Sequence, residues 1–546
     1  MIPEGIAAVK TPAAPRTMSH SFALKNRLFR LVLFAVLGGV HAASCQNPPE
    51  EATTIRLIRE AGAPAISRLL LGAQYNYFAA PTRQRLQDEH FLNSLRQMPV
   101  TAMRYPGGTW ADHYLWDSPE RSYYAVGDAG TVITPEQFVA SCRAIGAEPI
   151  FQVNTNMLDG EGSYINPGKL EDIQKGANRA ARWVREANKR KDWKVKYWEI
   201  GNEVWIWLKP EEYARYVVEY SKAMKEVDPS IQIIACGLSE KVGPFNPTWL
   251  KFPDDPTWSR EEVSNEPGAW NRALMDGAGG HFDCIAPHIY IEPGDEDMSA
   301  GERFAKTNAA IEFANPMPAQ VEWAKKGGKK IAVSEWAANF RQSVPVLKDA
   351  KAPTKMYYYS LGNGLNTAFL FGKILEAAGT TELAILHDLD DFMTLWNWPK
   401  AELAKEGPLL HPIYHAMKIW GHHLGKTSLA SQAKNCPTLK SEKGNYPVIF
   451  TYGSEDETNV YVVAINLDPE SSHQVRIATE LDLAGGSAEA TWLKGSGLDS
   501  QNFASWNGAA PQEVALTLEA VPATEGGWLL AMPAHSMVGL TIPKKR

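Results

Sequence analysis

The sequence lacks the short motifs that identify several large enzyme classes. It contains no HExxH, GxSxG or GxGxxG pattern, so metalloprotease, serine hydrolase and dehydrogenase chemistry have no support. Its five cysteines include no CxxC pair and no Cys/His metal spacing, and their odd number disfavours a dense disulfide framework. We therefore expect no metal and no cofactor. The cysteines are Cys45, Cys142, Cys236, Cys284 and Cys436.

Neither charge nor hydrophobicity points to nucleic acid or to a membrane span. Lysine and arginine total 55 against 62 aspartate and glutamate, a net charge of −7, so a basic surface for nucleic acid is not expected. Hydrophobic residues make up 44% of the chain, which is ordinary for a folded protein. The 18 tryptophans are typical of clefts that stack sugar rings, although large proteins also use tryptophan to fill cores.

The amino terminus has the pattern of a secretory signal. A basic stretch at 25–30 precedes the apolar run 31–40, and small residues follow at 42–44. That run is too short to span a membrane, so the pattern predicts a signal peptide over residues 1–44, or 18–44 if Met18 is the true start. We expect an exported protein, periplasmic, extracellular or at the cell surface. Cys45 follows Ala-Ala-Ser, which loosely resembles a lipoprotein cleavage site, so a lipid anchor at Cys45 stays an alternative to simple export.

Residues 68–424 alternate short apolar strands with amphipathic helices. The near-continuous apolar strands suit a parallel sheet covered on both faces. Helix signals separate them: a capping box at 134–137 precedes one helix, and Pro210 opens another. Eight strands with crossover helices predict a (β/α)8 TIM barrel, and a doubly wound open sheet is the competing topology. The expected strands are 69–75, 101–105, 149–154, 195–201, 231–236, 284–288, 330–335 and 383–387.

Beyond a spacer at 45–52, both chain ends contribute to a second domain. Residues 425–546 contain strand-like runs separated by Gly, Ser, Asn and Asp turns, with no long helical pattern, which predicts a β-sandwich. Residues 53–67 are expected to add an N-terminal strand to it. The expected strands of 425–546 are 446–452, 458–466, 473–477, 488–493, 514–518 and 536–542.

Polar residues at the ends of the barrel strands are the candidates for chemistry, because barrel enzymes place their active sites there. The fourth strand runs into Glu203 and the seventh ends at Glu335. Cleavage of a glycosidic bond requires two such carboxylates, one to protonate the leaving oxygen and one to attack the anomeric carbon or activate water. Asn202 is placed to bind a sugar 2-hydroxyl, and Arg104 to keep a nucleophilic carboxylate ionised.

Further residues are expected around this pair. His288 and Tyr290 end the sixth strand and would orient the carboxylates, although a structural histidine is an equal alternative for His288. Trp205 would form a sugar platform or anchor its loop. Trp396 or Trp398 would form the floor of the sugar site. The structural alternative for the two glutamates is that they only form salt bridges at the rim of the barrel. This is disfavoured because Arg104, Asn202 and His288 end neighbouring strands.

Four motifs on the expected strands resemble the clan A glycoside hydrolases. They are Arg-Tyr-Pro-Gly-Gly-Thr at 104–109, Trp-Glu-Ile-Gly-Asn-Glu at 198–203, His-Ile-Tyr at 288–290 and Ser-Glu-Trp at 334–336. The set is most similar to the α-L-arabinofuranosidases of glycoside hydrolase family 51, which pair a (β/α)8 barrel with a β-sandwich. This resemblance implies Glu203 as acid/base, Glu335 as nucleophile and Asn202 at the 2-hydroxyl. It also implies supporting roles for Arg104, Asn154 or Asn156, His288 and Tyr290.

Two departures from that family pattern concern the sugar. The family usually has an acidic residue after the first strand, where this chain reads Gly-Ala-Gln-Tyr-Asn-Tyr at 72–77. We expect Gln74 and Tyr75 of this stretch to contact the substrate. It also usually has Asp before the nucleophile, where this chain has Ser334. The predicted function is a secreted retaining glycoside hydrolase on polysaccharide or oligosaccharide, arabinofuranosidase-like. A β-xylosidase, an endo-glycanase and a non-catalytic carbohydrate-binding surface protein are the alternatives. Retention requires the two carboxylates to lie roughly 5–5.5 Å apart, whereas inversion needs about 6.5–9.5 Å.

Overall fold

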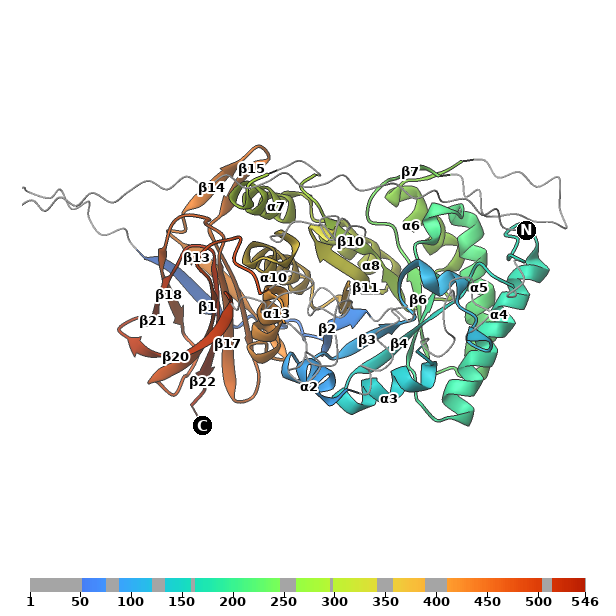
Figure 1. The fold of residues 1–546 in the computed structure, drawn as a ribbon, viewed down its shortest axis with the longest axis horizontal. Helices are drawn as coiled ribbons and strands as arrows, with labels where there is room; N and C mark the ends of the chain where they lie inside the picture. The colour runs from blue at the N-terminus through green and yellow to red at the C-terminus, as the bar shows by residue number, and fades with distance from the viewer. Residues whose placement is uncertain are drawn as a thin grey trace, which may run out of the picture. The chain divides into compact units, whose positions relative to one another are not determined.

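Parallel strands form a closed barrel in the first part of the chain (Figure 1). The computed structural model describes residues 52–74, 88–119, 133–158, 163–245, 262–294, 298–340, 357–387, 410–502 and 513–545, all within one unit, Glu51–Arg546. β12 pairs with β2, and both β9 and β10 pair with β11, which closes the ring. The TIM barrel predicted from the sequence is confirmed, and the doubly wound alternative is wrong. The barrel strands are β2 (Leu69–Gln74), β3 (Ala102–Tyr105), β4 (Glu148–Val153), β5 (Tyr197–Ile200), β6 (Gln232–Cys236), β9 (Cys284–Ala286), β10 (His288–Ile291), β11 (Lys330–Ala338) and β12 (Thr381–Leu386).

Helices follow the strands and begin at the signals seen in the sequence. α3 has Thr134 as its N-cap in a complete capping box, Pro135 as its first residue and a left-handed Gly146 at its end. α5 likewise opens on Pro210 and buries one face that includes Tyr213, Tyr216 and Tyr220. The helices are α2 (Glu89–Gln97), α3 (Pro135–Ile145), α4 (Leu170–Val184), α5 (Pro210–Val227), α6 (Pro267–Ala278), α7 (Ala300–Ala314), α8 (Met317–Gly327), α10 (Leu361–Leu375) and α13 (Pro412–His422).

The barrel has a filled interior and a larger core outside it. Side chains from several strands, including Leu69, Ile150 and Ile234, meet inside the ring, as expected for a packed barrel. Gly72 is needed where β2 closes onto β12, because a Cβ there would lie 2.3 Å from Ile385 Cδ1 and 2.6 Å from the Ala384 carbonyl oxygen. The large tryptophans pack mainly as core: Trp183, Trp198, Trp207, Trp270, Trp336 and Trp420 are fully buried.

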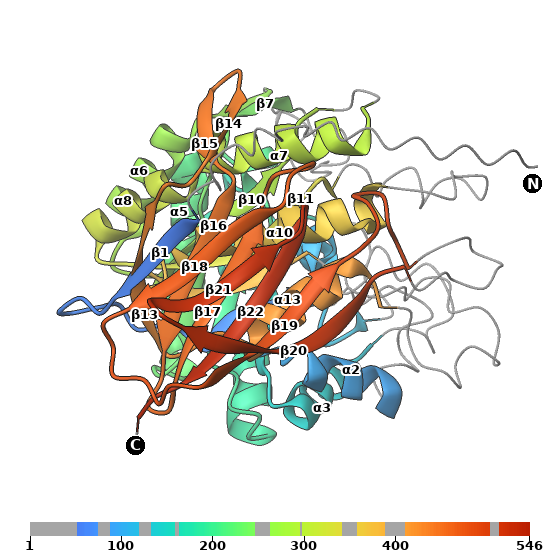
Figure 2. The ribbon, with the colours of Figure 1, turned by 90° about the vertical axis from the view of Figure 1, so that its left-hand side faces the viewer.

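The second domain is a ring of strands that includes one from the N-terminal end of the described chain. Figure 2 shows β1 (Thr53–Ile58), in blue, among the orange and red C-terminal strands, where it pairs with β13 and β18. β13 pairs with β16 and then β1, and β20 pairs with β19 and then β21, so each of these strands belongs to both sheets. The sequence predicted a β-sandwich, and these two strands join its two sheets into a closed barrel. The other strands are β13 (Thr427–Lys434), β16 (Ile449–Glu455), β17 (Asn459–Asn466), β18 (His473–Thr479), β19 (Ser487–Lys494), β20 (Ala515–Thr524), β21 (Gly527–Met532) and β22 (Ser536–Pro543).

Two antiparallel two-stranded sheets complete the assigned strands. They are β7 (Val242–Phe245) with β8 (Val263–Asn265), and β14 (Thr438–Ser441) with β15 (Gly444–Pro447). Among the residues just given as described, no helix is long and apolar enough to cross a membrane. The predicted signal peptide and Cys45 lie outside the described residues, and the domain boundaries drawn from the sequence stay predictions.

The C-terminal domain packs against the last helices of the TIM barrel. Phe450 and Tyr452 of β16 belong to the same apolar cluster as Trp420 of α13. His423, directly after α13, bonds through its two ring nitrogens to Thr541 at 2.9 Å and Thr491 at 2.8 Å. One apolar cluster therefore extends across the junction of the two domains, and the C-terminal ring encloses a second, separate cluster.

Candidate active site

The predicted acid/base lies in a tight turn at the carboxyl end of β5. Gly201 and Glu203 both have positive φ, 76° and 47°. A left-handed conformation suits glycine but is uncommon for glutamate, and such outliers often occur at functional sites. The Glu203 side chain keeps 30% of its surface exposed. The turn therefore presents a carboxyl group to solvent at the rim of the barrel.

The predicted nucleophile, Glu335, is held within strand β11 and is only 5% exposed. Arg104 donates to its Oε1 at 2.6 Å, and the Tyr290 hydroxyl donates to its Oε2 at 2.6 Å. Burial by itself raises the pKa of Glu335, but the positive charges of His288 and Arg104 outweigh burial and lower it to about 2. Glu335 is therefore an ionised carboxylate at any ordinary pH.

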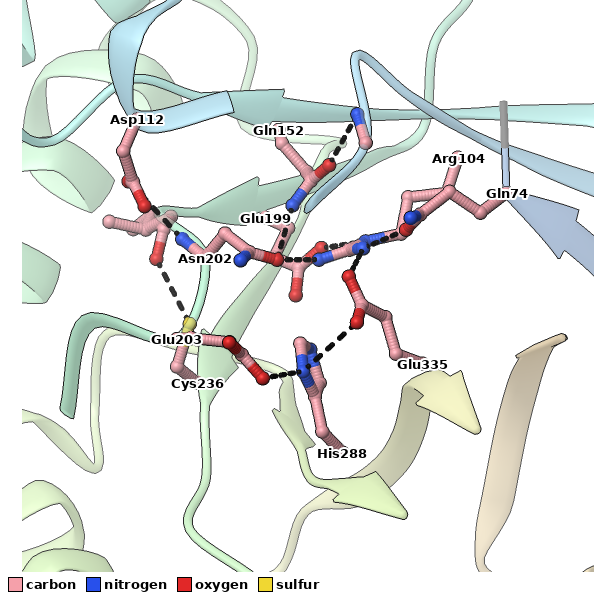
Figure 3. Close-up of polar contacts among 12 residues, drawn as sticks. Gln74, Arg104, Asp112, Gln152, Glu199, Asn202, Glu203, Cys236, His288 and Glu335 are labelled. Carbon is pink, nitrogen blue, oxygen red and sulfur yellow. Dashed lines mark hydrogen bonds and ion pairs between the residues drawn. The ribbon is translucent and has the colours of Figure 1, made fainter. Parts of the chain in front are cut away.

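His288 lies between the two glutamates, as Figure 3 shows. Its Nδ1 is 2.9 Å from Glu203 Oε1 and 3.4 Å from Glu335 Oε2. Burial lowers the pKa of His288, but the charges of Glu335 and Glu203 outweigh it, so the pKa is raised. One oxygen of each glutamate and a ring nitrogen of His288 all lie within 4.8 Å of one another. At least one oxygen of each carboxylate therefore lies close to the other glutamate, and the His288 ring contacts both.

The same three groups are the described residues that could ligate a metal ion. Their contacts have the lengths of hydrogen bonds, and the imidazole already occupies the space between the carboxylates. Two cooperating carboxylates account for the cluster without a metal.

Arg104, at the end of β3, connects four strands of the barrel (Figure 3). Besides Glu335 it donates to Glu199 Oε2 at 2.6 Å, to Asn202 Oδ1 at 2.8 Å and to Gln74 Oε1. Burial lowers the pKa of Arg104, but the charges of Glu199 and Glu335 raise it above the ordinary value. The guanidinium is thus permanently charged, and its planar fork fixes several neighbours at once.

Asn202 is oriented by its contacts with Arg104 and Gln152. The Gln152 amide donates to Asn202 Oδ1 at 3.3 Å, while Gln152 Oε1 accepts from the Gly107 backbone at 2.9 Å. Because two donors hold the oxygen of Asn202, its NH2 group is the end left to donate to a ligand. This is the orientation that binding a sugar hydroxyl next to Glu203 requires.

Other predicted residues have different surroundings. Gln74 is buried and serves as an acceptor for Arg104. Asn154 caps its own loop, since its side-chain oxygen accepts from the backbones of Asn156 and Met157. The side chain of Asn156 is fully buried. Trp205 is only 6% exposed and meets the His288 ring edge to face at 5.2 Å, so it packs behind the site rather than forming an open platform.

Three aromatic residues predicted to contact the sugar lie outside the described residues. These are Tyr75, Trp396 and Trp398. The sugar contacts assigned to them stay predictions.

Three residues of the network were not among the predicted site residues. Glu199 lies inside the Trp-Glu-Ile-Gly-Asn-Glu motif, one residue before the end of β5, and alternation along β5 could have placed it on the same face as Tyr197. Gln152 and Asp112 carry no comparable signal, because single polar residues in a strand and in a short 3-10 segment are common. Their roles become visible only from their contacts with Asn202.

Comparisons with known proteins agree with this geometry. A family model described as the alpha-L-arabinofuranosidase 1 domain matches residues 94–272. Probable alpha-L-arabinofuranosidase C of Aspergillus fumigatus is 31% identical over 163 residues, or 27% of this chain and 31% of that protein. The intracellular exo-alpha-(1->5)-L-arabinofuranosidase of Halalkalibacterium halodurans is 26% identical over 413 residues, 71% of this chain and 73% of its own length.

Solved structures show the same fold. The arabinofuranosidase of Thermotoga maritima in complex with arabinose matches with a TM-score of 0.64 at 20% identity, over 90% of this chain and 99% of that chain. The family 51 arabinofuranosidase of Xanthomonas axonopodis pv. citri matches with a TM-score of 0.65 at 17% identity, with the same coverage. The chain resembles the family 51 α-L-arabinofuranosidases. The resemblance predicted from the four motifs is thereby confirmed.

The extent of the family 51 likeness differs among relatives. The match spans 31% of the length of the Aspergillus fumigatus protein. A Paenibacillus polymyxa xyloglucanase of family 44 shares the fold with a TM-score of 0.57 at 11% identity, over 90% of this chain and 99% of that chain. The comparisons support an O-glycosyl hydrolase.

Proposed function

We propose that this protein is a retaining glycoside hydrolase that releases α-L-arabinofuranosyl groups. The observation that carries the proposal is the short spacing of Glu203 and Glu335, which each place a carboxylate oxygen within 4.8 Å of the other at the carboxyl ends of β5 and β11. Retaining enzymes separate these groups by roughly 5–5.5 Å, whereas inverting enzymes need about 6.5–9.5 Å to admit a water molecule. The spacing favours retention.

The mechanism is a double displacement. Glu335, kept ionised by Arg104 and by Tyr290, attacks the anomeric carbon and forms a glycosyl-enzyme. Glu203, on the exposed turn, gives its proton to the leaving oxygen in the same step. Water then attacks the anomeric carbon while Glu203 takes up its proton, and the bond to Glu335 breaks. His288, in contact with both carboxylates, orients them through both steps.

Asn202 supplies the sugar contact that matters most for rate. Arg104 and Gln152 donate hydrogen bonds to its side-chain oxygen, so its NH2 group is oriented to donate a hydrogen bond to the ligand. A hydrogen bond to the 2-hydroxyl strengthens as positive charge develops on the sugar ring. This interaction is made before the reaction starts and costs no rearrangement during it.

The identity of the sugar follows from the relatives rather than from the described residues. The matched relatives are named as arabinofuranosidases, which favours an α-L-arabinofuranoside as substrate. The stretch 72–77 stands where the family has its acidic residue, and within it Gln74 accepts a hydrogen bond from Arg104. The contact of that acidic residue would have to come from other residues, so a β-xylosidase or endo-glycanase remains the second candidate.

A panel of aryl glycosides and polysaccharides tests the proposed substrate. We expect release of p-nitrophenol from the α-L-arabinofuranoside and of arabinose from arabinan, with little release from the β-D-xyloside or from xyloglucan. Activity on the β-D-xyloside alone would overturn the sugar assignment. Binding to arabinan with no release from any substrate would instead support a non-catalytic carbohydrate-binding protein.

A glycine variant tests the assignment of the nucleophile. Glu335→Gly removes the attacking carboxylate, so turnover should fall by roughly 10⁴-fold or more. Added azide should restore turnover and yield a glycosyl azide of inverted configuration, because azide attacks from the side of the missing carboxylate. Retained activity in Glu335→Gly without azide would show that another group is the nucleophile.

We further propose that the protein is exported, since a basic stretch, an apolar run and small residues precede residue 45. The Halalkalibacterium halodurans relative is named as intracellular, so the leader distinguishes this chain from it. N-terminal sequencing of protein recovered from cell fractions tests this. A mature end near residue 45 supports export, and incorporation of labelled palmitate supports a lipid at Cys45. An intact leader on cytosolic protein would contradict both.

A further inference from the structure

Asp112 is a buried carboxyl group that contacts the active-site turn from behind. It lies in η1 (Gly108–His113), the short 3-10 segment after β3, and is 2% exposed. Its Oδ1 accepts from the Asn202 backbone N–H at 3.3 Å and from the Thr155 hydroxyl at 2.7 Å. Figure 3 shows Asp112 approaching the turn from the side opposite to His288 and Glu335. It touches neither glutamate, so it has no direct part in bond cleavage.

The turn it contacts is one that needs support. Glu203 has a φ of 47°, a conformation that L residues other than glycine rarely adopt and that costs on the order of 1–2 kcal/mol. The carbonyl of Val153, at the end of β4, accepts from the Gly201 backbone at 3.0 Å. Thr155 packs closely on Gly201, since a Cβ there would lie 2.8 Å from Thr155 Oγ1. The turn is thus held between the loop after β4 and Asp112.

We propose that Asp112, together with Thr155, is a positioning residue for the acid/base: it fixes the backbone of residues 201–203 and so sets where the Glu203 carboxyl group meets the leaving oxygen. The inference rests on the proposed function, because it assigns Glu203 the proton transfer. Glu203 needs such support more than Glu335 does. The side chain of Glu335 is fixed directly by Arg104 and Tyr290, whereas the side chain of Glu203 contacts His288.

The chemistry of Asp112 suits this role. Burial raises its pKa, hydrogen bonds from Thr155 and the Asn202 backbone lower it, and the result is about 8. A neutral carboxyl group accepts both hydrogen bonds through Oδ1 as an ionised one does, so the clamp persists across neutral pH. Burying a carboxyl group costs more free energy than burying an apolar residue. The hydrogen bonds that Asp112 accepts from Thr155 and from the turn explain why a carboxyl group is present here.

The proposal predicts an effect that depends on the leaving group. A poor leaving group needs a correctly placed proton donor, whereas a dinitrophenolate leaves without one. Displacing Glu203 while leaving Glu335 in place should therefore slow only the first kind of substrate. A general loss of structure would slow both kinds equally. The dependence of kcat/KM on the leaving group separates a positioning role from a merely structural one.

The experiment compares Asp112→Ala and Thr155→Val with their conservative partners, Asp112→Asn and Thr155→Ser. On a slow phenyl glycoside, kcat/KM should fall about 10- to 100-fold in the first pair, as expected when a catalytic group is misplaced. On the 2,4-dinitrophenyl glycoside the fall should stay within about 3-fold. The conservative variants should stay near wild type on both substrates, because Asn and Ser keep the acceptor and the donor.

Thr491→Val is the matched control, because it removes a buried hydroxyl that bonds to His423 at the domain junction, and it should not change the leaving-group dependence. An equal fall on both substrates in Asp112→Ala and Thr155→Val would overturn the inference. Thr155→Val is nearly isosteric, so it decides the matter if Asp112→Ala does not fold. If Glu203→Gln itself lacked leaving-group dependence, the proposed function would fail rather than the role of Asp112.

Discussion

The surroundings of the two glutamates differ sharply. Glu335 extends from a β-strand, is 5% exposed and is bonded directly by Arg104 and Tyr290. Glu203 lies in a left-handed turn, is 30% exposed, and its side chain contacts His288. A nucleophile must stay ionised and still, whereas an acid/base must gain and lose a proton and reach both the leaving group and water. The protein fixes one through its side chain and the other through its backbone.

The largest expected effect comes from removing the cation beside Glu335. Arg104→Met leaves Glu335 and Glu199 as buried carboxylates without their partner, and breaking a buried pair costs about 3–5 kcal/mol. We expect activity to be lost and the melting temperature to fall. Arg104→Lys keeps the charge but not the planar fork, so it should fold better and still lose most activity.

Arg59 provides the control for this change. It pairs with Glu455 in the C-terminal domain and is about half exposed, so Arg59→Met should alter stability by less than about 1 kcal/mol and activity little. Near wild-type turnover in Arg104→Met, measured on the preferred aryl glycoside, would refute the role given to Arg104.

The next effect concerns Glu203 and depends on the substrate. Glu203→Gln removes the proton donor, so kcat/KM on a phenyl glycoside should fall by roughly 10²- to 10⁴-fold. On a dinitrophenyl glycoside, kcat/KM should change far less, while kcat falls because water attack on the intermediate loses its base. Added azide should raise kcat and give a glycosyl azide with retained configuration. Equal losses on both substrates would mean that Glu203 is not the acid/base.

A smaller effect is expected at Tyr290. Its hydroxyl donates to Glu335, and a hydrogen bond to a charged group contributes about 1.5–3 kcal/mol. Tyr290→Phe should therefore lower kcat/KM by about 10- to 100-fold on both kinds of leaving group. Tyr414→Phe removes a buried hydroxyl bonded to the Ser94 carbonyl in α2 and should leave kcat/KM unchanged. A loss confined to poor leaving groups would place Tyr290 with Glu203 instead.

The smallest effect is on stability and comes from Asp112. Its pKa rises from an ordinary 3.8 to about 8 in the folded protein. Between these values the unfolded chain has lost the proton that the folded chain keeps, so this group makes stability decline as pH rises from about 4 to 8. Asp112→Asn lacks the decline. Its melting temperature relative to wild type should rise over that range by several degrees, because each pKa unit corresponds to about 1.4 kcal/mol. A constant difference from pH 5 to 8 would contradict the raised pKa.

The barrel and the glutamate pair were predictable because strong local signals agreed. The run ending at Arg104 and the motif ending at Glu203 marked strand ends, and apolar runs such as 330–335 continued as β11 (Lys330–Ala338). Edges were harder. β13 is mostly exposed, and β21 (Gly527–Met532) contains no polar side chain although only alternate residues are buried, so neither shows the usual alternation of polar and apolar residues. The closed ring depends on long-range pairing of β13 with β1.

Within the site, the motifs pointed to Arg104, Glu203 and Glu335, but Glu199 was missed inside one motif and Asp112 and Gln152 were missed outside them. Asp112 and Gln152 act through contacts with Asn202, ninety and fifty positions away along the chain, and no local pattern predicts such contacts. Trp205 is the opposite case, because its position in the sequence suggested a role in sugar binding. A tryptophan beside Glu203 indicates a sugar platform, but packing against His288 and Trp270 gives it a buried place.

The central claim is that two closely spaced carboxylates act by double displacement, and the anomeric configuration of the first product tests it most directly. Hydrolysis of an aryl α-L-arabinofuranoside can be followed by proton NMR before the free sugar mutarotates. The account predicts that the α-anomer of arabinofuranose forms first and the β-anomer follows only by mutarotation. Initial release of the β-anomer would mean inversion and would contradict the roles assigned to Glu203 and Glu335.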